Sequence, residues 1–193
     1  MRIIKRQGTT DKIHDARYEI QEIRFYNDSA ATNPEAAAAA IMTFAKRDTG
    51  QETWDKRHGI LEKNQKKSKL SSLISNLSSL ILIAGGKDKN LNYQPLADAI
   101  AQSGQVRKVI LFGENKFKIE RELRSMKYEV SKIELTGDLK SAVKISYKTA
   151  QTLVASGYTL VAILLSPASA SFDMFKNYAE RGLAFKKLVK SLK

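Results

Sequence analysis

Residues 164–182, LLSPASASFDMFKNYAERG, join an apolar run to a turn of small and hydroxyl side chains. The apolar run stops at Leu165, and Ser166, Ser169 and Ser171 follow before the next helical pattern. Small side chains leave backbone N–H groups accessible, and a helix N-terminus adds partial positive charge. This segment therefore predicts an anion pocket.

Two other apolar runs also end in polar turns. Residues 85–90, GGKDKN, combine two glycines with Lys87 and Lys89, which are point charges suited to a carboxylate or a phosphate. Residues 26–33, YNDSAATN, place the Asp28 carboxylate among amides and hydroxyls. These residue types are also common helix caps, so a binding role and a structural role both remain open for this turn.

The sequence argues against several kinds of catalysis. It has no cysteine, which excludes disulfides, thiolate zinc sites and cysteine nucleophiles. Neither G-x-x-x-x-G-K-[ST] nor G-x-G-x-x-G occurs, and there is no G-x-S-x-G elbow. The two histidines, His14 and His58, lie far from the serine-rich segment in sequence, and no cluster has metal-ligand spacing. We therefore assign no catalytic residue and no metal ligand.

The 193 residues carry a formal net charge of +13, which raises the question of nucleic-acid binding. The lysines are scattered, with local concentrations at residues 63–69 and 186–193, and no nucleic-acid-binding signature accompanies them. Nucleic-acid binding is therefore disfavoured as the main role. The sequence has no apolar stretch of about 18 residues and no secretory signal, so we expect a cytoplasmic protein without a membrane partner.

The segments between these turns alternate between strand and helix patterns. Strands are expected at residues 22–26, 80–84, 106–112, 133–135 and 159–165. Helices are expected from Pro34 onward, with Asn33 as cap, at residues 95–102, 115–126 and 138–155, and in a tail capped by Asp173. This alternation predicts an α/β fold with a Rossmann-like, mostly parallel sheet flanked by helices. Ligands of such sheets bind at the carboxyl ends of the strands, where all three turns fall.

Taken in order, four stretches resemble the C-terminal domain of the Mur ligase family, most closely its D-glutamate-adding members. They are FYNDSAATNPEA, ILIAGGKDKNLNYQPLA, LFGE and LLSPASASFDMFKNYAERGLAF. The resemblance runs from about residue 17 to residue 193. It implies a lead-in segment at residues 1–16 and a Mur ligase C-terminal domain at 17–193, with a lysine-rich insertion at about 47–77.

The family's reaction, by this resemblance, is ATP-dependent amide formation in peptidoglycan synthesis. ATP phosphorylates the carboxylate of UDP-N-acetylmuramoyl-L-alanine, and the amine of D-glutamate then attacks. ATP and magnesium belong to the complete enzyme. Because the P-loop and the UDP-binding domain are missing from these residues, we expect the chain to bind no cofactor and to be inactive by itself. A separate chain carrying the N-terminal and central domains would then be its partner.

The resemblance also assigns two groups of binding residues. Those expected to hold D-glutamate are Thr32 and Lys89 for the α-carboxylate, Ser171 and the backbone at Phe172 for the side-chain carboxylate, and Tyr178 as a wall. Those expected to contact the nucleoside of ATP are Asp28 and Arg17.

One departure from the family leaves a second hypothesis open. Ala30 stands where the family commonly has a lysine, which removes a phosphate-side cation. The alternative is a non-catalytic binding or regulatory module of the same fold, acting on nucleic acid or on an acidic partner. Strong salt dependence of binding to a duplex would support that alternative.

Overall fold

A single six-stranded sheet forms the centre of the computed structural model, which describes residues 2–5, 21–48 and 78–192. The strand order is β1-β2-β6-β3-β4-β5. The strands are β1 (Arg2–Lys5), β2 (Gln21–Asn27), β3 (Ser78–Gly85), β4 (Val106–Phe112), β5 (Ile133–Leu135) and β6 (Leu160–Leu165). The strand pairs β2–β6, β6–β3, β3–β4 and β4–β5 are parallel, whereas β1 pairs antiparallel with β2. The predicted α/β class with a mostly parallel sheet is confirmed.

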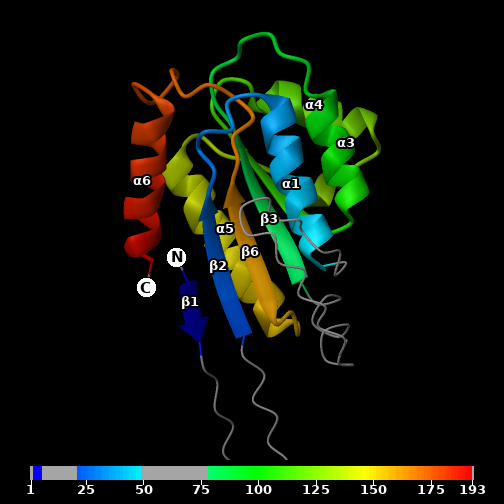
Figure 1. Cartoon of the computed structure of the whole chain (residues 1–193), viewed down its shortest axis with the longest axis vertical. Coiled ribbons are helices and arrows are strands. Elements are labelled where there is room, and N and C mark those ends of the chain that lie inside the picture. Colours follow the sequence, from blue (N-terminus) through cyan, green and yellow to red (C-terminus); the bar gives the residue numbers. More distant parts are fainter. Residues whose placement is uncertain (1, 6–20, 49–77, 193) are drawn as a thin grey trace, which may run out of the picture.

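Helices cover both faces of this sheet (Figure 1). They are α1 (Pro34–Asp48), α3 (Gln94–Ser103), α4 (Lys116–Ser125), α5 (Leu139–Ala155) and α6 (Tyr178–Lys190), with a short 3-10 turn at Val130–Lys132. Alternate residues of the strands face opposite layers. Leu80 and Leu82 pack in the cluster that includes α1, α3 and α4, whereas Ile81 and Ile83 pack in the cluster that includes α5 and α6. The inner strands are therefore apolar on both faces, as buried parallel strands are.

Most of the expected elements agree with the structure within two residues. The cap of α1 is confirmed, since Asn33 Oδ1 accepts a hydrogen bond of 2.8 Å from Ala36 N. The strand β1, within the lead-in segment, was not anticipated. The segment at residues 49–77, including the leucine-rich run before β3 and the lysines at 63–69, lies outside the described residues. None of the helices among the described residues is long and apolar enough to span a membrane.

The prediction that Asp173 caps the last helix is wrong. The observed cap of α6 is Asn177, four residues after Asp173, and its Oδ1 accepts a 2.8 Å hydrogen bond from Glu180 N. The physical reason is a local turn in which the Ser171 carbonyl accepts from the N–H groups of Met174 and Phe175. Asp173 instead accepts a hydrogen bond of 3.3 Å from Glu114 N, after β4.

Candidate functional site

Three turns meet at the carboxyl edge of the sheet because β2, β6 and β3 are neighbours. Asn27 of β2 and Ile83 of β3 both align with Leu165 of β6, so the three strands end close to the same level. We call the following segments the first turn (residues 28–33), the serine-rich turn (166–176) and the glycine–lysine turn (86–92). Their convergence was predicted from the sequence and is confirmed.

Backbone hydrogen bonds join the serine-rich turn to the glycine–lysine turn. Gly85 N donates to Pro167 O at 2.8 Å, and Lys87 N donates to Ala170 O at 2.9 Å. Gly86 lies between them at a φ of 150°. A Cβ on Gly86 would be 2.3 Å from Ala170 O, so this close approach requires glycine.

Lys89 and the serine-rich turn lie on the same side of this junction. The Lys89 ammonium is 5.5 Å from the ring centroid of Phe172, within the range of a cation–π contact. Among the described residues Lys89 has no carboxylate partner, whereas Lys87 pairs with Glu114 at 2.6 Å. That ion pair raises the pKa of Lys87. Of the two lysines, Lys89 is therefore the one with its charge open to a ligand.

Ser171 is a buried serine whose hydroxyl has no hydrogen-bond partner among the described residues; its exposed fraction is 2%. The N–H of the next residue, Phe172, also has no acceptor in that part of the chain. The side chains of Phe172 and Tyr178 are more than half exposed and flank the segment. Two adjacent donors are thus open beside exposed aromatic rings.

In the first turn, Thr32 carries a hydroxyl comparable to that of Ser171. It is half-buried, and its hydroxyl has no partner among the described residues. The neighbouring polar groups are engaged: the Ser29 hydroxyl donates to Tyr178 O at 2.8 Å, and Asn27 donates to Gly182 O at 3.1 Å.

The two expected nucleotide contacts have different outcomes. Asp28 Oδ2 accepts a hydrogen bond of 2.8 Å from Ser166, and its other oxygen has no partner in the described part of the chain. Arg17 lies outside the described residues.

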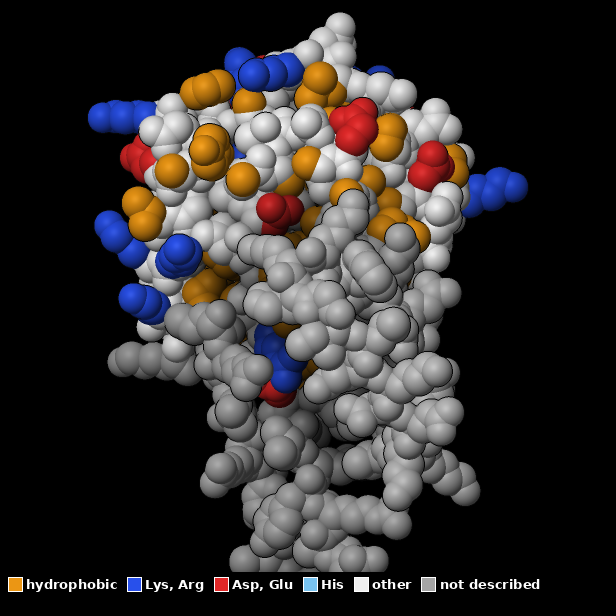
Figure 2. All heavy atoms as spheres, in the orientation of Figure 1, with side chains coloured by type: hydrophobic (Ala, Val, Ile, Leu, Met, Phe, Trp, Pro, Cys, Tyr) orange, Lys and Arg blue, Asp and Glu red, His pale blue; other side chains and the backbone are white. Residues whose placement is uncertain are grey.

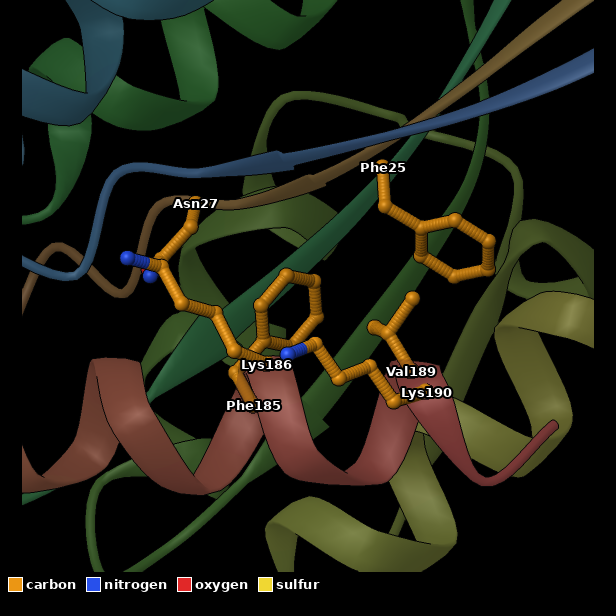
Figure 3. Close-up of a pocket in the computed structure, with 6 residues that line it drawn as sticks. All are labelled: Phe25, Asn27, Phe185, Lys186, Val189 and Lys190. Atoms are coloured by element: carbon orange, nitrogen blue, oxygen red, sulfur yellow. The ribbon is translucent and has the colours of Figure 1, made fainter. Parts of the chain in front are cut away.

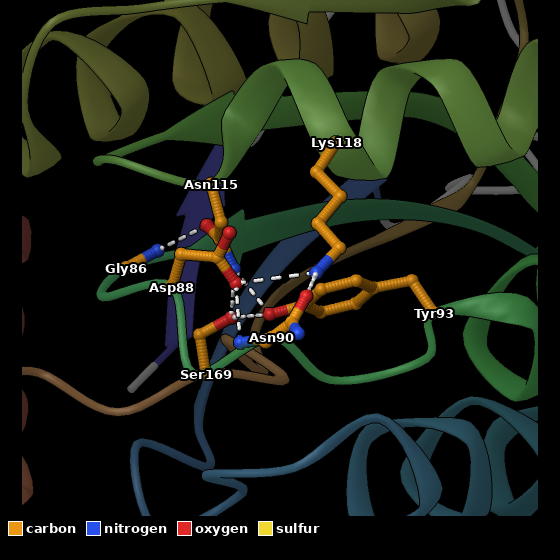
Figure 4. A network of polar contacts seen from close by, with 7 residues as sticks. All are labelled: Gly86, Asp88, Asn90, Tyr93, Asn115, Lys118 and Ser169. Atoms are coloured by element: carbon orange, nitrogen blue, oxygen red, sulfur yellow. Dashed lines mark hydrogen bonds and ion pairs between the residues drawn. The ribbon is translucent and has the colours of Figure 1, made fainter.

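Asn115 organises a buried network behind the turns, and sequence reasoning missed it (Figure 4). Its side chain accepts from Gly86 N at 2.9 Å and donates to Ser169 Oγ at 2.6 Å and to the Tyr93 hydroxyl. Burial raises the pKa of Tyr93, and its hydroxyl also shares a hydrogen bond of 3.1 Å with Ser169 Oγ. The network fixes the backbone of the two turns that carry Lys89 and Ser171.

Arg181 of α6 is a second residue that sequence reasoning did not single out. It is fully buried, and burial lowers its pKa to about 10. Its Nε donates to Ser29 Oγ at 3.0 Å, its Nη2 to Ser29 O at 3.0 Å, and its Nη1 to Ala170 O at 3.2 Å. The only available signal was an arginine at an apolar position of a lysine-rich helix.

An apolar hollow lies elsewhere, between β2 and α6 (Figure 3). Its volume is about 220 Å³, and its lining residues are Phe25, Asn27, Phe185, Lys186, Val189 and Lys190. None of the predicted binding residues lines it, so the candidate site is the open junction of the turns and not this hollow.

The basic charge of the chain is not gathered at one place on the face in view. Figure 2 shows lysine and arginine side chains spread over several elements, with acidic side chains between them. On this face, the described residues in view form no continuous basic groove for a duplex.

The fold and the site define an α/β domain of the Rossmann-like type, with unpaired hydrogen-bond donors at the carboxyl edge of its sheet. No protein-family model matches the chain. Curated proteins named UDP-N-acetylmuramoylalanine–D-glutamate ligase do match it. The relative from Thermoanaerobacter sp. (strain X514) is 34% identical over 175 residues, which are 91% of this chain and 30% of that protein. The relative from Caldicellulosiruptor bescii is 36% identical over 90% of this chain and 29% of its own length.

A more distant source gives a similar match. The ligase of Bdellovibrio bacteriovorus is 34% identical over 87% of this chain and 27% of its own length. The resemblance to the Mur ligases is therefore confirmed, and this chain is a relative of the D-glutamate-adding ligases. It spans about 30% of the length of the curated relatives it matches.

Proposed function

We propose that this chain is the D-glutamate-binding domain of a UDP-N-acetylmuramoylalanine–D-glutamate ligase. One observation carries the proposal. At this edge of the sheet, some hydroxyl groups form hydrogen bonds within the protein and others do not. The hydroxyls of Ser29, Ser166 and Ser169 take part in hydrogen bonds within the protein. Those of Thr32 and Ser171 have no such bond among the described residues. Open donors beside satisfied neighbours are what a ligand site requires.

The donors divide into two groups that suit a diacid. In the proposed pose, Lys89 and Thr32 bind the α-carboxylate, and Ser171 with the Phe172 N–H binds the side-chain carboxylate. Tyr178 forms a wall. Charge-assisted contacts of this kind contribute about 1.5–3 kcal/mol each. Holding both carboxylates leaves the amine of D-glutamate as the free nucleophile, oriented for attack.

In the complete ligase, ATP with magnesium supplies the phosphoryl group that activates the acceptor carboxylate. The donor set here suits the nucleoside end of that cofactor, because Asp28 keeps one carboxylate oxygen open for a hydroxyl group. Arg17 is the second proposed contact. Among the described residues no group of three His, Asp or Glu side chains is arranged to hold the metal.

We further propose that ligation needs parts of the enzyme beyond the region that this chain matches. UDP-N-acetylmuramoyl-L-alanine, ATP and magnesium would be held there, on the same polypeptide or on a partner chain. The 193 residues alone would then form no amide bond in the presence of all three substrates. Product formation by the isolated chain, measured by chromatography, would contradict this part of the proposal.

Calorimetric titration of the 193-residue chain with D-glutamate tests the proposed site. We expect weak binding that prefers D-glutamate to L-glutamate. Lys89→Met and Ser171→Ala should each lower the affinity about tenfold or more, as the loss of one charge-assisted contact implies. Lys148→Met, an exposed lysine of α5, is the matched control and should leave the affinity unchanged.

Two results would reject the proposal. One is the absence of D-glutamate binding at millimolar concentration. The other is binding that is unaffected by both site substitutions. Salt-sensitive binding to duplex DNA with no binding of D-glutamate would support the alternative of a non-catalytic module.

A further inference from the structure

The Arg181 side chain touches two of the three turns at once. From the first turns of α6 it donates twice to Ser29 in the first turn and once to Ala170 in the serine-rich turn. Ser29 precedes the proposed ligand Thr32 by three positions, and Ala170 is adjacent to Ser171. A single planar group thus connects the backbones that carry the two ends of the proposed diacid site.

The base of α6 is held firmly enough for this role. Asn177 caps the helix through Glu180 N, and the Glu180 carboxylate accepts a hydrogen bond of 2.7 Å from Lys176 N, the residue before the cap. A Cβ on Gly182 would lie 3.1 Å from the Asn27 amide nitrogen and 3.3 Å from Ser29 Cβ. The helix therefore packs directly against the first turn at the residue after Arg181.

The Arg181 charge has no direct counter-charge in the described part of the chain. Its three hydrogen-bond acceptors are neutral, and the Asp173 carboxylate acts on it only through space. Buried charges in proteins are usually paired with an opposite charge. An anion bound at the adjacent turns would supply part of that missing charge.

We propose that Arg181 is a positioning residue that fixes the spacing of the two turns, and thereby the length of the diacid that the site accepts. This inference rests on the proposed D-glutamate site. The five N–H donors of arginine lie in one rigid plane, whereas lysine has a single ammonium that cannot span both turns. Arg181→Lys therefore keeps the charge and removes the spacer, whereas Arg181→Gln removes both.

The discriminating measurement is the ratio of D-glutamate to D-aspartate affinity for the full chain. The wild-type chain should favour the five-carbon diacid. Arg181→Lys should lower the D-glutamate affinity at least tenfold and bring the ratio close to one, because the spacing is no longer fixed. Arg181→Gln should weaken the binding of both diacids further. The control Arg121→Lys, on the exposed surface of α4, should change neither quantity.

Hydrogen exchange without ligand tests the connection between the turns separately. In Arg181→Lys, amides of residues 28–31 and 169–172 should exchange at least tenfold faster together, while those of residues 81–83 in β3 keep their protection. Ser29→Ala removes one acceptor of Arg181 and should produce a smaller change in the same two segments. This second variant keeps the test valid if Arg181→Lys does not fold.

The outcomes separate the two proposals. If the wild-type chain binds no D-glutamate, the proposed function fails and the role in diacid length fails with it, while exchange still decides whether Arg181 connects the turns. If the wild-type chain binds and Arg181→Lys retains both the affinity and the ratio, the inference about Arg181 is wrong. An equal loss for both diacids with uniformly faster exchange would indicate a purely structural role and would also reject it.

Discussion

The Ser166 hydroxyl donates a hydrogen bond of 2.8 Å to the Asp28 carboxylate across 138 positions of sequence. Asp28 N in turn donates to Leu165 O at 2.8 Å. These contacts join the turn after β2 to the turn after β6. The two turns lie far apart in the sequence, so this connection exists only in the folded chain. The geometry of the candidate site thus depends on tertiary contacts.

Ser166→Ala should reduce the free energy of unfolding by about 1.5–3 kcal/mol, because the hydrogen bond goes to a charged, half-buried carboxylate. Urea denaturation followed by circular dichroism measures this. Ser191→Ala, at the exposed end of α6, is the matched serine control and should change stability by no more than about 0.5 kcal/mol. Equal effects of the two substitutions would contradict the assignment.

Gly86→Ala should destabilise the chain by about 3 kcal/mol or more, since it combines an unfavourable positive φ with a clash against Ala170 O. The control is Gly137→Ala, where a Cβ would meet no atom within 4 Å. Thermal unfolding of the two variants should separate them clearly. A stable Gly86→Ala variant that still binds D-glutamate would show that the close approach of the two turns is dispensable.

Alkaline conditions should destabilise the fold through Tyr128. Its hydroxyl donates to Val106 O at 3.1 Å, and burial raises its pKa to about 12. A tyrosine pKa that is higher in the folded state contributes stability below its unfolded pKa of about 10. That contribution is lost as the pH rises from about 10 toward 12. In Tyr128→Phe, denaturation at several pH values should show a smaller loss over this window.

The helix cap offers a direct test of the correction at Asp173. Asn177→Ala should cost about 1 kcal/mol of stability by removing the acceptor for Glu180 N. Asp173→Ala should leave the helix content unchanged, since Asp173 does not cap α6. Its loss should instead accelerate amide exchange at Glu114, which donates to Asp173. Fraying of α6 in the Asp173 variant would restore the original prediction.

The fold was largely predictable because its signals are local. The apolar run of β3, the glycine after α3 and the Asn33–Pro34 pair each specify structure within a few residues. The misplaced cap at Asp173 has the same origin. Both Asp173 and Asn177 are capable caps, and the pattern does not show that the Ser171 carbonyl closes a separate turn in which Asp173 contacts the distant Glu114.

The turns that form the candidate site were predictable from the sequence. The residues that hold those turns in place were not. The turns that carry Lys89 and Ser171 could be located because glycine, lysine and serine after apolar runs are local signals, whereas the binding roles of these two residues remain a proposal. Asn115 and Arg181 act through contacts with residues 11 to 152 positions away. An isolated Asn carries no sequence signal for such a role, and an Arg at an apolar helix position does not reveal its partners, so the folded arrangement identifies both.

The position of β6 between β2 and β3 has a consequence for biosynthesis. Strand β6 is the last strand in the sequence but lies between β2 and β3. A ribosome must therefore release residues 160–165 before β6 can pair with both of these strands. Until then one edge of β2 and one edge of β3 stay unpaired in the nascent polypeptide. Such late closure, with contacts of long sequence separation, is typical of slow folding and of dependence on chaperones during synthesis.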